Sequence, residues 1–184
     1  MNINKTLILL AIVLPISACE SEAPADEASV DQTSKGAGLL KPFKMELQHA
    51  LKTGMSQGPE HAIEVCRVKA PEIAASLSRE GIRMGRASHK LRNPGNEGPE
   101  WVQPILADYL QTGQREPVKV ALENGYIGYA EPIGIQPLCL TCHGETLAPG
   151  IAATIAEAYP EDRATGFANG DLRGVFWVEF PTHK

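Results

Sequence analysis

Apolar residues recur at three- and four-residue spacing in the first half of the chain, a pattern that predicts amphipathic helices. One helix is expected over residues 39–55, and a second from Pro59, which follows Gly58, to Gly81. A third is expected over residues 99–112. The apolar stripe of the second helix consists of Ile63, Cys66, Ala70, Ile73 and Leu77.

The second half of the chain favours strands. Residues 118–122 and 126–135 are strand-like runs joined at Asn124-Gly125, a dipeptide typical of tight hairpins. A short helix is expected over residues 151–158 and a final strand over residues 174–180. Because the helices come first and the antiparallel strands later, the pattern predicts an α+β domain.

The first residues have the order of a secretory signal peptide, with Lys5 followed by the apolar run Leu7–Ile16 and then Ser17-Ala18-Cys19. The run is too short to span a bilayer. A cysteine directly after small residues at the end of a signal peptide is typical of bacterial lipoproteins. Residues 1–18 are therefore expected to be removed, and Cys19 is expected to carry lipid. This predicts a periplasmic protein that is anchored to a bacterial membrane through Cys19.

Residues 19–36 contain small and acidic side chains, which predicts a solvated tether, and residues 37–184 are expected to form the folded domain. The whole chain has 17 basic and 22 acidic residues and a formal net charge of -5. This balance argues against a nucleic acid as partner.

The most specific functional motif of the sequence is Cys139-Leu140-Thr141-Cys142-His143, which has the C-x-x-C-H pattern of c-type haem attachment. The two thiols can bond to the two vinyl groups of one porphyrin, while His143 coordinates the iron. The pattern therefore predicts one covalent haem c, bound through Cys139 and Cys142.

Two other chemistries stay open for these thiols. A redox-active C-x-x-C pair is expected beside a βαβ pattern, and a structural zinc site needs further ligands, typically from a second knuckle. The sequence shows neither feature. Cys66 is left without a partner, and its place on an apolar stripe is also compatible with a core residue.

A six-coordinate iron needs a second axial ligand, and the sequence alone does not choose one. The candidates are Cys66, His49, His61, His89, Met45, Met55 and Met84, or an open position. Residues 83–96, which are rich in glycine, proline and basic side chains, are expected to form an irregular loop. The loop's basic cluster could bind the haem propionates or could simply be solvated; it consists of Arg83, Arg86, Lys90 and Arg92.

Several stretches together resemble a bacterial family of PAS-like c-type haem domains, and the match spans nearly all of the chain beyond the tether. The matching stretches are residues 62–66 and 70–74, 85–88 and 91–96, the CLTCHG segment, Tyr159-Pro160, and residues 170–174. The resemblance implies a PAS-like antiparallel sheet with flanking helices and His/Cys ligation of the iron, by His143 and Cys66. Ala87 departs from the family, which has threonine or serine there.

These features predict a haem protein for redox or diatomic-gas sensing, or for low-potential electron transfer. A sensor would need a signalling partner and a carrier a redox partner protein. The alternative is a haem enzyme, such as a peroxidase or a small-molecule reductase, with His89 or Glu64 as an acid–base group.

Overall fold

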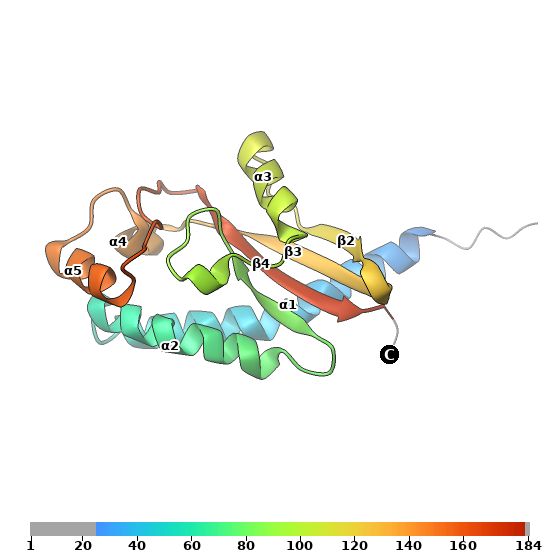
Figure 1. Ribbon diagram of the computed structural model, residues 1–184, viewed down its shortest axis with the longest axis horizontal. Coiled ribbons are helices and arrows are strands. Elements are labelled where there is room, and N and C mark those ends of the chain that lie inside the picture. Colours follow the sequence, from blue (N-terminus) through green and yellow to red (C-terminus); the bar gives the residue numbers. More distant parts are fainter. Residues whose placement is uncertain (1–24, 183–184) are drawn as a thin grey trace, which may run out of the picture.

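Two long helices cover one face of a small antiparallel sheet in the structure, a computed structural model that describes residues 25–182 (Figure 1). The helices are α1 (Ala25–Met55) and α2 (Pro59–Leu77), joined by a short turn. The expected signal peptide and the lipidation site Cys19 lie outside the described residues. None of the helices between residues 25 and 182 is both long and apolar enough to cross a membrane.

The sheet has four antiparallel strands in the order β1-β4-β3-β2. They are β1 (Arg83–Ala87), β2 (Val118–Leu122), β3 (Tyr126–Gly134) and β4 (Leu172–Pro181). Helix α3 (Val102–Thr112) projects from the other face, while α4 (Leu140–His143) and α5 (Pro149–Ala158) lie at one end of the sheet (Figure 1). The predicted α+β class is confirmed.

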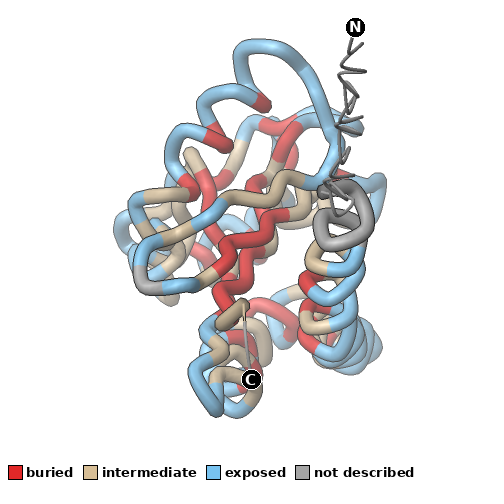
Figure 2. The backbone as a smooth tube through the Cα atoms, turned by 90° about the vertical axis from the view of Figure 1, so that its right-hand side faces the viewer, coloured by how far each residue is buried: buried red, intermediate tan, exposed pale blue. Residues whose placement is uncertain are grey.

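Alternation along β4 divides the core between the two faces of the sheet. Val178 and Phe180 pack with Phe43 of α1, whereas Val175 and Trp177 pack with residues of α3. Figure 2 shows the buried backbone gathered in the central strands, with exposed segments around them. The sheet therefore carries core residues on both faces, and one of its ends lies next to α4 and α5.

The hairpin at Asn124-Gly125, the helix near residue 151 and the last strand are confirmed. The second helix is confirmed from Pro59 onward, but it ends at Leu77 and not at Gly81. The irregular loop expected over residues 83–96 is partly wrong, because its first five residues form β1. Gly85 is accommodated in that strand because the Trp177 ring covers it: an added Cβ would lie 2.8 Å from the ring. Glycine here allows close packing, not a turn.

The solvated tether expected over residues 19–36 is corrected from residue 25 onward, because α1 begins at Ala25. The Lys35 ammonium group donates a hydrogen bond of 3.3 Å to the Pro181 carbonyl, and it lies 5.1 Å from the centre of the Phe180 ring. Gly36 is buried against Tyr129. Tertiary contacts with the sheet thus support a helix that the acidic composition did not suggest.

Gly36→Ala is expected to destabilise the protein by roughly 1–3 kcal/mol, because the new methyl group would lie 2.4 Å from the Tyr129 ring. Gly38→Ala on the same helix is a matched control, since no atom lies within 4 Å of its added Cβ. That change should stabilise the protein by up to about 1 kcal/mol through helix propensity. Chemical denaturation of both variants measures the difference, and equal stabilities would contradict the docking of this segment.

Candidate haem site

A cavity of about 320 Å³ is enclosed by α1, α2, the end of the sheet and α4. Its size is in the range of small-molecule and cofactor sites. The lining includes the predicted attachment residues Cys139, Cys142 and His143, the ligand that the family resemblance implies, Cys66, and two of the four basic candidates, Arg86 and Arg92. These residues come from four separate parts of the chain, so the fold brings them together.

The residues of the C-x-x-C-H pattern are helical: Cys139 ends a 3-10 turn (Pro137–Cys139), and Leu140–His143 form the short helix α4. Gly144 ends this helix, where an added Cβ would lie 2.6 Å from the Leu140 carbonyl oxygen. A returning segment then pairs with it: Phe167 N–H donates to the His143 carbonyl and Gly166 N–H to the Gly144 carbonyl, both at 3.0 Å. The thiols and the imidazole are therefore held on an ordered backbone.

His143 is oriented as a metal ligand requires. Its Nδ1 lies 2.7 Å from the Ala164 carbonyl oxygen, which can only accept, so the proton is on Nδ1 and the lone pair is on Nε2. Burial, with help from the charges of Arg173 and Arg92, lowers the pKa of His143 to about 3. The imidazole is thus neutral near pH 7 and can coordinate a metal through Nε2.

Arg92 is already bound by protein groups. Its guanidinium group forms a bidentate pair with Asp162, at 3.0 and 3.1 Å, and donates to the Cys142 carbonyl at 2.7 Å and the Ala164 carbonyl at 3.3 Å. Asp162 also accepts a hydrogen bond from Ala164 N–H. Arg92 therefore fixes the backbone on both sides of His143, a positioning role that sequence analysis did not anticipate.

Cys66 and Tyr159 form the part of the cavity wall that lies near Arg86. Burial raises the pKa of the Cys66 thiol, while the positive charges of Arg86 and Arg92 oppose the increase. Burial and the charge of Cys66 raise the pKa of the Tyr159 phenol. Arg86 itself has no hydrogen bond or ion pair with any residue of the described part of the chain, although burial lowers the pKa of its guanidinium group.

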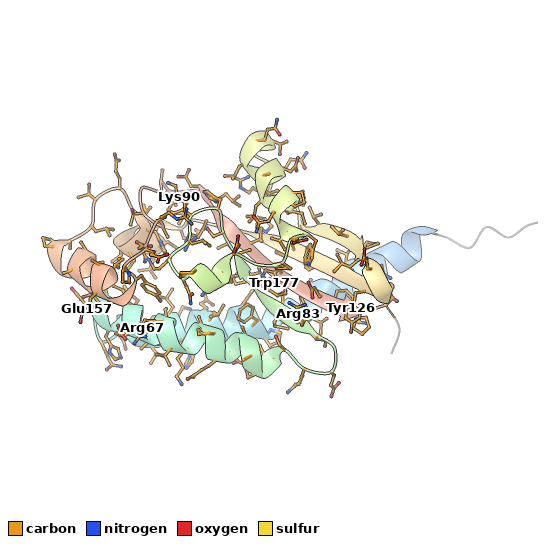
Figure 3. The ribbon with its side chains drawn as sticks, in the orientation of Figure 1. Arg67, Arg83, Lys90, Tyr126, Glu157 and Trp177 are labelled. Atoms are coloured by element: carbon orange, nitrogen blue, oxygen red, sulfur yellow. The ribbon has the colours of Figure 1, made fainter. Side chains whose placement is uncertain are left out.

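The basic cluster expected to meet propionates is only partly present at the cavity. Arg83 lies at the far end of β1 and pairs with Glu179 at 3.2 Å, whereas Lys90 lies 4.8 Å from the centre of the Phe167 ring (Figure 3). Neither residue lines the cavity. Arg86 and Arg92 do, and Arg86 also lines an adjoining second cavity of about 200 Å³.

The structure separates the candidates for the second axial ligand. Cys66 and Met55 line the cavity, whereas His89 and Met84 do not. His49, His61 and Met45 are exposed. The two acid–base candidates for an enzyme are also elsewhere: His89 packs edge-on against Phe167, and Glu64 pairs with Arg67 at 2.9 Å.

The alternative of a metal ion bound directly by protein side chains finds no site in the structure. Among residues 25–182, no three His, Cys, Asp or Glu side chains form a group that could hold an ion. Cys66, Cys139 and Cys142 are all free thiols. A haem iron receives four ligands from the porphyrin, so it needs only the isolated axial donors that this cavity provides.

Three further residues contribute to the site without having been singled out from the sequence. Tyr159 lines the cavity, Asp162 holds Arg92, and Arg173 donates to Ser88 Oγ at 2.6 Å. Tyr159 and Arg173 lie in stretches that carried the family resemblance, so this was the available signal. No signal in the sequence pointed to Asp162, because its role depends on how the chain folds around residue 164.

Comparison with known proteins places the chain among characterised folds. The model of the Tll0287-like family matches residues 20–181. Among solved structures, the crystal structure of the cyanobacterial haem protein Tll0287 is 27% identical in sequence, with a TM-score of 0.59. The match covers 86% of this chain and 97% of that one. No curated protein matches the chain.

Proposed function

The chain belongs to the Tll0287-like family, and from this premise we propose that it is a c-type haem protein of the bacterial periplasm whose function is to respond to redox state or to a diatomic gas. The observation that carries the proposal is one cavity that combines two free thiols, a neutral histidine with an available Nε2, and a third thiol. A porphyrin bound there supplies a redox-active iron.

Different residues of this chain would bind different parts of the cofactor. Cys139 and Cys142 would form thioether bonds to it, and His143 and Cys66 would provide the two axial ligands. The cationic side chains of the cavity wall would balance the propionates. The network of Arg92, Asp162 and Ala164 supports this assignment, because it orients His143.

Ligation by Cys66 would determine the redox behaviour of the iron. A thiolate donates negative charge to the iron, so it favours the ferric state and a low reduction potential. Burial raises the pKa of the free thiol, so Cys66 would be protonated whenever it is not bound to iron. A change of Cys66 between a bound thiolate and a free thiol would be the means by which this chain reports the redox state to a partner protein.

Low-potential electron transfer is a second candidate because of a feature at the cavity rim. Leu138 precedes Cys139, lines the cavity, and leaves 51% of its surface exposed. An exposed apolar side chain at this place would suit transient contact with a redox partner protein. Stopped-flow reduction separates the two: a sensor changes its axial ligation on reduction, and a carrier keeps it.

The expected location is the periplasmic side of a bacterial membrane, with lipid on Cys19 as anchor. This part of the proposal rests on the order of residues 1–19. Membrane fractionation of cells that produce the wild-type chain and Cys19→Ala tests it. Retention of the alanine variant in the membrane fraction would contradict lipid anchoring through this cysteine.

Covalent attachment is expected to show as a protein mass that exceeds the polypeptide and its acyl chains by one haem. The extra mass should survive acid denaturation in the wild type and be lost from Cys139→Ser/Cys142→Ser, because thioether bonds resist acid and a noncovalent haem does not. Mass spectrometry of the purified protein makes the measurement. A colourless protein without added mass would overturn the proposal.

A further inference from the structure

The second cavity, of about 200 Å³, shares a wall with the first. The residues that line both cavities are Ala70, Arg86, Asn93 and Asn96. The second cavity lies between α2, the edge strand β1 and the loop after β1, and its lining includes Trp177 of β4. No aspartate or glutamate among residues 25–182 lines it. A group that extends from the first cavity past Arg86 would therefore enter a space without negative charge.

Trp177 is buried, with 8% of its surface exposed, and its indole N–H has no hydrogen-bond partner in the described part of the chain. It pairs with Gly85 of β1 in the sheet register, and its ring covers that glycine (Figure 3). An added Cβ would lie 3.1 Å from Trp177 Nε1 at Gly85 and 3.5 Å from it at Gly98. The N–H group therefore lies between the edge strand and the loop that follows it, where two glycines leave it room.

The indole N–H of Trp177 needs an acceptor. A buried donor without a partner costs free energy, and such donors are almost always bonded in native proteins. Trp101, the other tryptophan of the chain, shows the usual arrangement, because its Nε1 donates to the Glu179 carboxylate at 2.8 Å. The acceptor for Trp177 has to come from a molecule that enters the second cavity.

The other polar groups of the second cavity favour an anionic acceptor. Arg86 is positively charged and forms no hydrogen bond or ion pair with residues 25–182. Asn93 uses its side-chain oxygen to accept from Gly95 N–H at 2.9 Å, which leaves its amide N–H groups as donors. A water molecule could satisfy the indole but not the guanidinium charge, whereas a carboxylate can accept from both donors at once.

We propose that the second cavity holds a carboxylate group that accepts hydrogen bonds from Trp177 Nε1 and Arg86, and that this carboxylate is a propionate of the haem. The inference rests on the proposed haem function and adds Trp177 to the residues that position the cofactor. The shared wall supports it, because a propionate is a short flexible arm that can extend from the first cavity into the second. Arg92, the other arginine predicted to meet a propionate, is instead paired with Asp162.

Resonance Raman spectroscopy of the haem-loaded protein tests the contact, because the bending bands of the propionates respond to hydrogen bonding. Trp177→Phe keeps an aromatic ring but removes the N–H group, so it should shift one of the two propionate bands and leave the other in place. Arg86→Gln should shift the same band. Trp101→Phe is the matched control and should shift neither band, since the Trp101 N–H is bonded to Glu179.

Two outcomes of the Raman experiment would overturn the inference. Unchanged propionate bands in Trp177→Phe would show that the indole does not contact a propionate. If Trp177→Phe and Arg86→Gln shifted different bands, the two residues would bind different carboxylates and the shared position would be wrong. A wild-type chain without haem would instead refute the proposed function itself, so the two failures are distinguishable.

A second measurement does not require Trp177→Phe to fold. The chain has two tryptophans, so the haem-loaded, isotope-labelled protein should give two indole N–H signals in its nuclear magnetic resonance spectrum, and Trp101→Phe identifies the signal of Trp177. That signal should show the downfield shift of a hydrogen-bonded indole and should stay in place when acetate is added. A shift typical of a free indole would overturn the inference. A signal that moves with acetate would assign the cavity to a free carboxylate and exclude the propionate as its source.

Discussion

Cys66→Ala is expected to abolish the thiolate features in the low-temperature electron paramagnetic resonance spectrum of the ferric protein. It should also raise the reduction potential by on the order of 0.1 V or more, since axial ligands span about 0.8 V in haem proteins. The physical reason is that an anionic sulfur donor stabilises ferric iron, and alanine supplies no donor at all. Spectroscopy of the oxidised protein and a potentiometric titration measure the two effects.

Met55 provides the sharpest comparison, because it is the other candidate ligand that lines the cavity. Met55→Leu keeps most of the side-chain volume but removes the thioether sulfur, so thiolate features and potential should stay close to those of the wild type. Survival of the thiolate features in Cys66→Ala would exclude Cys66 as a ligand. Loss of the native spectrum in Met55→Leu alone would assign the position to methionine.

Local patterns predicted the elements of this fold better than their mutual arrangement. The helical stripe through Ile63 and Ile73 and the hairpin at Asn124-Gly125 are encoded within short windows, so they were recognised. Strand β1 was missed because Gly85 and its basic neighbours suggest a loop, and only the Trp177 ring of β4 makes glycine suitable there. The start of α1 depends in the same way on contacts with the distant Tyr129.

The site shows the same division between local and distant information. Cys139, Cys142 and His143 were identified because their chemistry depends on spacing within one segment. Spacing could not show that Arg92 binds Asp162, a residue 70 positions away, while Arg86 remains unpaired. Two arginines with the same expected role therefore differ in the structure, and only the three-dimensional arrangement distinguishes a positioning group from a free charge.

Arg92→Met is expected to destabilise the haem-loaded protein by about 3–5 kcal/mol, because it leaves the Asp162 carboxylate buried without its partner. The two side chains of this pair are only 11% and 9% exposed. The change also removes the donors to the carbonyl groups of Cys142 and Ala164, and Ala164 orients His143. The iron–histidine bond should therefore become heterogeneous, which a broadened absorption band and a denaturant titration would show.

Two comparisons separate the buried network from a general effect of losing an arginine. Arg67→Met breaks an exposed pair with Glu64, in which both side chains are 47% exposed, and should leave the stability close to that of the wild type. Adding Asp162→Asn to Arg92→Met should recover part of the lost stability, because the uncompensated charge disappears while the amide oxygen can still accept from Ala164 N–H. If Arg92→Met and Arg67→Met had similar stabilities, the network could not be what holds the histidine in place.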